Sequence, residues 1–244
     1  MTSVDPRGVP ARQKLTWGLG DVVTIWVAAS ALSSITVGIV QGARGVRSST
    51  TDDVAVFVGL LAMGVGVLVA TQIVSRIKGS GSMAQDFGLA LRLSDWPWLV
   101  AGAVLQVAVL PLVWLLDDVS QHGEKSQQVA QALRDGHGAF VVLAAIGAVT
   151  LAPLTEELLF RGVLLRSLLR RCSPMVAVLL SALIFGLAHF LDPDSRPLLA
   201  PLMLLGVISA VRAVRSGDLS QSIWLHAGFN LISVVFLLAG WSGV

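Results

Sequence analysis

Charged residues are scarce in this sequence. Asp, Glu, Lys and Arg make up 13% of its 244 residues, against 55% for hydrophobic residues. Soluble domains carry about twice that share of charge, so the composition excludes a soluble globular protein and indicates an integral membrane protein. The net charge of +2 is carried by basic residues in short segments between apolar runs. Orientation in a membrane explains such residues, so no nucleic-acid partner is predicted.

Cysteine is almost absent as well. Cys172 is the single cysteine of the chain, which excludes an internal disulfide bond. It follows Arg170 and Arg171 in a turn between two apolar runs. We predict no reactive role for its thiol.

Long apolar runs fill most of the remaining chain, and a membrane-spanning helix needs about 20 such residues. They predict an all-α polytopic bundle of about seven spans, forming one transmembrane domain over residues 17–244 behind a disordered cytoplasmic tail over 1–16. A short surface helix is expected over 124–135, in the loop that also carries His122 and His137 as solvent-exposed residues. The expected spans are 22–40, 54–74, 96–116, a fourth starting near 139, 174–191, a short sixth over 197–211, and 219–240.

The distribution of Lys and Arg predicts the orientation of the bundle. With the N-terminus inside, twelve of these residues fall on the cytoplasmic side, within 1–16, 75–95, 161–173 and 212–218, and five fall outside. Short cytoplasmic loops are enriched in Lys and Arg, so we expect a cytoplasmic N-terminus. The short loops also suggest a bacterial plasma membrane.

Two adjacent carboxylates and an arginine interrupt the fourth apolar run. Glu156, Glu157 and Arg161 follow residues 139–154, which carry no charge. Charges at membrane depth are expensive and mark functional sites. On a helix, Glu157 and Arg161 face each other, while Glu156 points about 100° round the axis. We therefore expect an ion pair that leaves Glu156 free for chemistry, one turn after a kink at Pro153.

Further polar side chains lie inside later apolar runs. Phe185 and His189 share one helix face, as do His226 and Asn230. Glu156 lies sixteen residues before Cys172 and His189 lies seventeen after it. A helical hairpin turning there returns His189 to the depth of Glu156, so the fourth, fifth and last helices are predicted to share one site.

These groups are suited to hydrolysis of an acyl bond. Glu156 can act as general base on a water that His189 orients. His226 and Asn230 can donate hydrogen bonds to the developing oxyanion. The alternative is zinc held by Glu156, His189 and His226, with an open position for water. The sequence has no His-Glu-x-x-His motif, so such a metal site would have to be assembled from separate helices. We favour the reaction without a cofactor.

Three motifs in this order resemble those of the CPBP family, the Abi or type II CAAX prenyl endopeptidase intramembrane proteases. They are Glu156-Glu157-x-x-x-Arg161, Phe185-x-x-x-His189 and His226-x-x-x-Asn230. The resemblance covers a core over about 139–240. It implies that Glu156 and His189 activate water and that His226 and Asn230 form the oxyanion hole, with Glu157 and Arg161 in support. Other accounts of the family describe a metalloprotease.

The same resemblance implies the class of substrate but not its identity. Eukaryotic relatives remove the last three residues of prenylated CAAX proteins, whereas many bacterial ones are tied to bacteriocin self-immunity or to processing of membrane-bound peptides. We expect a membrane-associated peptide or protein substrate and contact with the lipid bilayer. The alternatives are a non-catalytic immunity or scaffold protein of the same family, and a small transporter with a Glu/His proton relay. The intact set of polar positions argues against the first, and the lack of paired half-repeats argues against the second.

Overall fold

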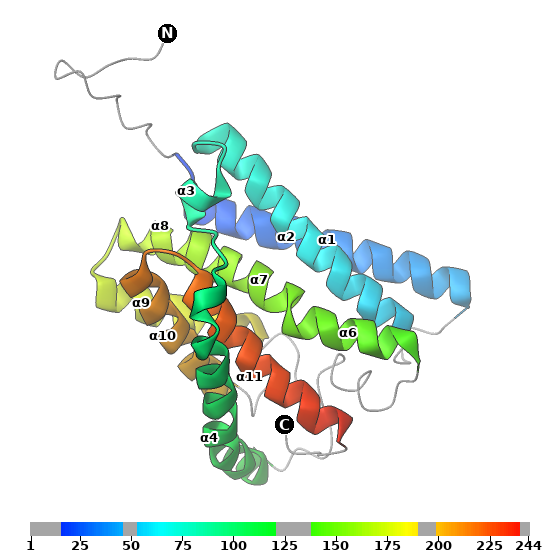
Figure 1. Cartoon of the computed structure of the whole chain (residues 1–244). Coiled ribbons are helices and arrows are strands. Elements are labelled where there is room, and N and C mark those ends of the chain that lie inside the picture. Colours follow the sequence, from blue (N-terminus) through cyan, green and yellow to red (C-terminus); the bar gives the residue numbers. More distant parts are fainter. Residues whose placement is uncertain (1–15, 46–52, 121–137, 190–198, 240–244) are drawn as a thin grey trace, which may run out of the picture.

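The computed structural model describes residues 16–45, 53–120, 138–189 and 199–239, and all regular structure in these ranges is helical (Figure 1). The all-α prediction is therefore confirmed. The tail, the surface helix over 124–135, His122 and His137 lie outside the described residues, apart from residue 16. The elements are α1 (Leu19–Arg44), α2 (Asp53–Lys78), α3 (Met83–Phe87), η1 (Leu93–Asp95), α4 (Pro97–Ser120), α6 (Ala139–Val149), α7 (Leu151–Glu157), η2 (Leu158–Leu165), α8 (Arg166–Leu169), α9 (Pro174–His189), α10 (Leu199–Ser216) and α11 (Ser220–Leu238).

Six helical segments in the described ranges are long and apolar enough to cross a membrane, which makes this an integral membrane protein. The expected span that is not among these six is the fifth, which corresponds to α9 and has 16 described residues. The expected short sixth span, α10, is longer than predicted because it continues to Ser216 past its arginines. The guanidinium of Arg212, inside this helix, stacks on the Trp98 ring, 4.2 Å from its centroid, and donates a hydrogen bond to the side chain of Gln221.

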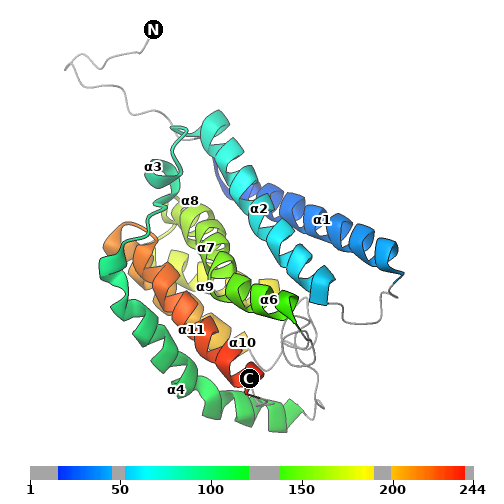
Figure 2. The same ribbon diagram turned by 45° about the vertical axis from the view of Figure 1, so that its right-hand side comes forward.

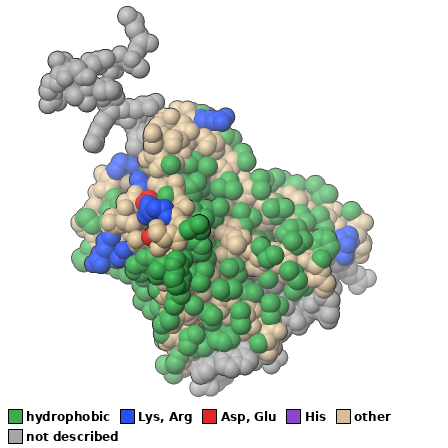
Figure 3. Space-filling model, in the orientation of Figure 1, with side chains coloured by type: hydrophobic (Ala, Val, Ile, Leu, Met, Phe, Trp, Pro, Cys, Tyr) green, Lys and Arg blue, Asp and Glu red, His purple; other side chains and the backbone are tan. Residues whose placement is uncertain are grey.

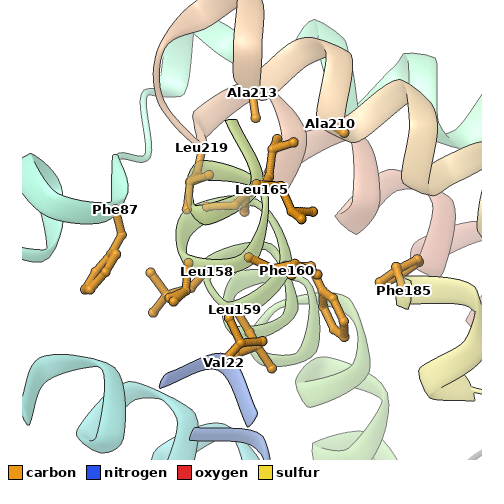
Figure 4. Close-up of a cluster of buried hydrophobic side chains, with 14 of the residues drawn as sticks. Val22, Phe87, Leu158, Leu159, Phe160, Leu165, Phe185, Ala210, Ala213 and Leu219 are labelled. Atoms are coloured by element: carbon orange, nitrogen blue, oxygen red, sulfur yellow. The ribbon is translucent and has the colours of Figure 1, made fainter. Parts of the chain in front are cut away.

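Three helix pairs surround one central helix. α1 packs along α2, α4 along α11 and α9 along α10, while the continuous segment from α6 to α8 contacts all three pairs (Figures 1 and 2). All eight residues of η2 are buried. Figure 4 shows Val22 of α1, Phe87 of α3 and Phe185 of α9 arranged around this segment. The acidic doublet therefore lies on the helix that the rest of the fold encloses.

Glycines set how closely the paired helices approach. A Cβ on Gly66 of α2 would lie 2.9 Å from the Cα of Ala29, so α1 and α2 make a close contact of the small-residue type. The tightest crossing was not predicted. A Cβ on Gly102 of α4 would overlap the carbonyl oxygen of Leu225, and one on Gly228 of α11 would overlap that of Leu99. Each of these glycines faces the backbone of the other helix.

The four segments assigned to the cytoplasm by charge meet at one end of the molecule. Thr16 N donates to Lys78 O over 3.0 Å, Leu219 N donates to Gly88 O over 2.9 Å, and an Arg170 nitrogen donates to Trp17 O over 2.7 Å. We call this the basic end. Figure 3 shows several Lys and Arg side chains gathered there, beside a surface that is otherwise mostly hydrophobic.

Candidate active site

The backbone around the acidic doublet is not a regular α-helix. The helix breaks at Thr150, whose φ and ψ are −115° and −61°. The kink expected at Pro153 thus lies three residues earlier, because the hydrogen bond that proline cannot make is the one to Val149 O. After Glu157 the chain follows a π-helix, η2, which the sequence did not indicate. Ser181 Oγ of α9 donates to Phe160 O in this segment over 3.1 Å. π-Helical segments are frequent at functional sites.

Glu157 has two partners. Its Oε1 lies 3.3 Å from Arg161 Nη1, and both side chains are fully buried. The prediction that these residues face each other is confirmed. The same Oε1 lies 2.9 Å from His226 Nδ1, so the expected self-contained ion pair is in fact a group of three. Helical spacing finds a partner on the same helix but gives no information about one that comes from α11.

Arg161 also connects the site to its surroundings. Its Nη2 donates to Gly206 O of α10 over 3.3 Å, and its guanidinium lies 4.4 Å from the centre of the Phe185 ring. Several polar atoms near this pair are buried without a hydrogen-bond partner, and groups of this kind in proteins are usually bonded to ordered water. They are Glu157 Oε2, Arg161 Nε and Nη1, and Ser209 Oγ, three residues after Gly206.

Glu156 lies between two imidazole rings. Its Oε2 is 3.8 Å from His189 Nε2 and 3.8 Å from His226 Nε2. Both separations are too long for direct hydrogen bonds. This oxygen is buried and has no hydrogen-bond partner, although the Glu156 side chain as a whole is 29% exposed. The two glutamates therefore differ, since Glu157 is bonded and inaccessible while Glu156 is unbonded and partly accessible.

Phe185 packs against both imidazole rings. Its ring centre lies 4.9 Å from that of His189 and 5.7 Å from that of His226, both in edge-on arrangements. Its carbonyl oxygen lies 2.9 Å from His189 Nδ1. A carbonyl only accepts, so Nδ1 carries the proton of a neutral His189 and Nε2 presents a lone pair toward Glu156.

Asn230 is on the same face of α11 as His226 but is bonded elsewhere. Its Nδ2 donates to Ala148 O, two residues before the break at Thr150, over 2.8 Å. One N–H of the amide is thus used to hold α11 against α6, and the second is the one left for a ligand. The structure brings Glu156, His189 and His226 together and places Asn230 one turn further along α11.

The depth of His226 follows from a contact at the basic end. Arg166 Nη2 donates to Gly217 O over 2.6 Å. Glu156 lies ten residues from Arg166, and His226 lies nine residues from Gly217. The two side chains reach the same level, since His226 Nε2 lies 3.8 Å from Glu156 Oε2, so a residue near the start of α11 belongs to the site.

The donor set was tested for zinc. Two Nε2 atoms and one carboxylate are suitable ligands, and both Nδ1 atoms have the carbonyl or carboxylate partner typical of metal-bound histidines. The spacing is wider than zinc requires, because two ligands of a tetrahedral zinc lie about 3.3 Å apart when the bonds are about 2.05 Å. Among the described residues, no group of three or more His, Cys, Asp or Glu side chains has the spacing to hold a metal ion. In this arrangement, the residues do not fit the metal.

The part of the chain that carries this site matches a known protein family. Residues 138–232 match the model of the family described as type II CAAX prenyl endopeptidase Rce1-like. This match over residues 138–232 agrees with the resemblance of the three motifs to the CPBP or Abi family. The matched range of the CPBP family includes every residue of the site described above. The family is one of proteases, in agreement with the resemblance of the three motifs.

A relative in Escherichia coli, described as "Uncharacterized 24.3 kDa protein", is 33% identical over 149 residues. The match covers 60% of this chain and 66% of the relative, so the chain spans just under two thirds of the length of this curated protein. No solved structure matches the chain.

Proposed function

We propose that this protein is an intramembrane endopeptidase of the CPBP type that hydrolyses a peptide bond of a membrane-associated substrate. The observation that carries the proposal is the position of Glu156, whose buried, unbonded Oε2 lies 3.8 Å from Nε2 of His189 and of His226. An unpaired carboxylate beside two imidazoles in an apolar bundle is a functional arrangement by default.

Activation of water follows from the hydrogen-bonding roles. Glu156 Oε2 and His189 Nε2 are both acceptors, and the 3.8 Å between them leaves room for a molecule that donates to each. A water in this position gives its proton to Glu156 as its oxygen attacks the scissile carbonyl. The protonated Glu156 then returns that proton to the leaving amine when the C–N bond breaks.

Stabilisation of the oxyanion is assigned to His226 and Asn230. His226 Nδ1 donates to Glu157, so its Nε2 can donate to an oxyanion only when the ring carries both protons. Glu156 and Glu157 carry two negative charges against the one positive charge of Arg161, and a protonated His226 makes this group of four neutral. The free N–H of Asn230 is the second donor.

The reaction is proposed to proceed without metal, because the three donors are spaced too widely for zinc. We also propose a bacterial plasma membrane, from the short loops and the Escherichia coli relative, and a cytoplasmic N-terminus, from the Lys and Arg of the basic end.

The test is cleavage of quenched fluorescent peptides by the purified protein in detergent, with single-span peptides and a prenylated CAAX peptide as probes. Glu156→Gln should lower the rate by at least about 10²-fold while the thermal unfolding midpoint is kept. Asp95→Asn, which removes a carboxylate at the basic end, is the matched control and should cleave at the wild-type rate. Near wild-type turnover of Glu156→Gln would favour the scaffold alternative. A wild-type protein that cleaves none of the probes would also contradict the proposal.

A further inference from the structure

Positive charge exceeds negative charge at the basic end. The described part of this end has eight basic residues (Arg76, Lys78, Arg92, Arg166, Arg170, Arg171, Arg212 and Arg215) and four acidic ones (Asp21, Asp86, Asp95 and Asp218). The four carboxylates have partners other than Arg170 and Arg171. Asp21 pairs with Lys78, Asp95 and Asp218 pair with Arg92, and Asp86 accepts from Ser75 and Ser80.

Arg170 and Arg171 lie together without a carboxylate partner among the described residues. Arg170 stacks on Trp17, with its guanidinium carbon 3.9 Å from the ring centre, and donates to Trp17 O over 2.7 Å. Arg171 Nη1 donates to Ser167 O over 2.7 Å, and a Cβ on Gly18 would lie 2.9 Å from its Nη2. Partial burial, followed by repulsion from Arg171 and Arg166, lowers the pKa of Arg170.

Their position at the end of α8 does not by itself account for this arrangement. Cations stabilise the C-terminus of a helix, which explains the bond from Arg171 to Ser167 O. It does not explain why Arg170 reaches Trp17, which precedes α1. Each guanidinium has five N–H donors, and the bonds above use only some of them.

We propose that Arg170 and Arg171 form a binding site for the phosphate group of an anionic phospholipid, with the buried Trp17 ring holding Arg170 in place. Arginine binds phosphate through two parallel N–H bonds. The site lies where α1 begins and where the central span ends, and therefore at the membrane surface. Anionic lipids there attract basic residues. These observations favour a lipid phosphate over free phosphate in solution.

A bound lipid would join two parts of the fold. Trp17 leads into α1, whereas Arg170 follows the continuous segment that carries Glu156. Neutralising the two guanidinium groups removes their mutual repulsion and so stabilises the contact between the α1–α2 pair and the central helix. The bound lipid should therefore raise the stability of the folded protein.

The experiment measures thermal unfolding of the full chain in a neutral detergent, with phosphatidylglycerol or phosphatidylcholine added. Phosphatidylglycerol should raise the midpoint of the wild-type protein by about 3 °C or more, and phosphatidylcholine should have little effect. In the double variant Arg170→Gln, Arg171→Gln most of this rise should be lost. The matched control Arg76→Gln, Arg215→Gln removes the same charge from exposed positions at the same end and should keep it.

Equal rises in the two double variants would overturn the proposal, since they would show a response to net charge alone. Equal rises with the two lipids would do so as well. A rise with sodium phosphate alone, lost in the Arg170→Gln, Arg171→Gln variant, would assign the site to free phosphate and overturn the lipid. If that variant does not fold, Arg170→Lys, Arg171→Lys keeps the charge without the two-bond geometry and should lose more than half of the rise. A full rise in the lysine variant would then contradict the proposal.

Discussion

His226 Nδ1 lies 2.9 Å from Glu157 Oε1, across a contact between α11 and the central helix. Glu157 is also paired with Arg161, so its carboxylate is held as an acceptor and Nδ1 of His226 is held as a donor. The orientation of the imidazole is thereby fixed, with Nε2 directed toward Glu156 at 3.8 Å. Glu157 thus fixes the orientation of the imidazole ring that faces Glu156.

The protonation of the two histidines can be measured directly. We expect Nδ1 to carry a proton in both His189 and His226, because one contacts a carbonyl and the other a carboxylate that is paired with Arg161. ¹⁵N NMR of histidine-labelled protein reports which ring nitrogen is protonated, and His189→Gln and His226→Gln assign the signals. A neutral His189 with its proton on Nε2 would contradict the proposed role in orienting water.

The buried ion pair predicts strong coupling between its members. Arg161→Met or Glu157→Gln alone should lower the free energy of unfolding by about 3–5 kcal/mol, because each leaves a fully buried charge without its partner. The double variant should be more stable than the sum of the two losses implies. Thermal unfolding of the four proteins in one detergent gives the coupling energy.

The exposed pair of Arg92 and Asp218 is the control for this cycle. Solvent screens such a pair, so Arg92→Gln with Asp218→Asn should couple by about 1 kcal/mol or less. Additive losses at Glu157 and Arg161 would show that their contact does not contribute to stability.

Metal dependence separates the two mechanisms that the sequence left open. If Glu156 and His189 alone activate water, extensive treatment with chelator should leave the rate of peptide cleavage unchanged. Elemental analysis should then find less than one zinc per chain. Stoichiometric zinc, loss of activity on its removal and recovery on its return would overturn the metal-free proposal.

The glycine crossing predicts a stability effect on the face of α11 that packs against α4. In Gly228→Ala the new methyl group would meet the carbonyl of Leu99, which is backbone and cannot move aside freely. We expect a loss of about 1–3 kcal/mol in the free energy of unfolding. Gly38→Ala in α1 is the control, because nothing lies within 4 Å of its added Cβ, and it should be neutral or slightly stabilising. Equal effects of the two variants would mean that α4 and α11 do not cross so closely.

The sequence predicted those features that depend on position along a helix. The Glu157–Arg161 contact follows from four-residue spacing, and the approach of His189 to Glu156 follows from counting residues on either side of a turn. The resemblance to the family followed from motifs that lie within the matched residues 138–232. In each case, the information lies along one helix or one hairpin.

The remaining features depend on how helices are placed side by side. The bond from His226 to Glu157, the bond from Arg161 to Gly206 and the reciprocal fit of Gly102 and Gly228 each join helices that are distant in the chain. The sequence predicted equal depth only for Glu156 and His189. Its position seven residues into the last span placed His226 closer to the cytoplasmic side, and this prediction was wrong, because His226 Nε2 lies 3.8 Å from Glu156 Oε2. The π-helix η2 is likewise not encoded in the apolar pattern.

The partner of Glu157 is 69 residues further along the chain. In biosynthesis, the central helix therefore emerges from the ribosome well before the side chain that completes its buried charge group. Until α11 arrives, Glu157 has Arg161 but not His226 as a partner, and Glu156 has no imidazole from that helix. Insertion of α11 is then the step that completes the buried charge group and stabilises the bundle. The order in which the segments enter the membrane should therefore determine the fraction of the protein that reaches the folded state.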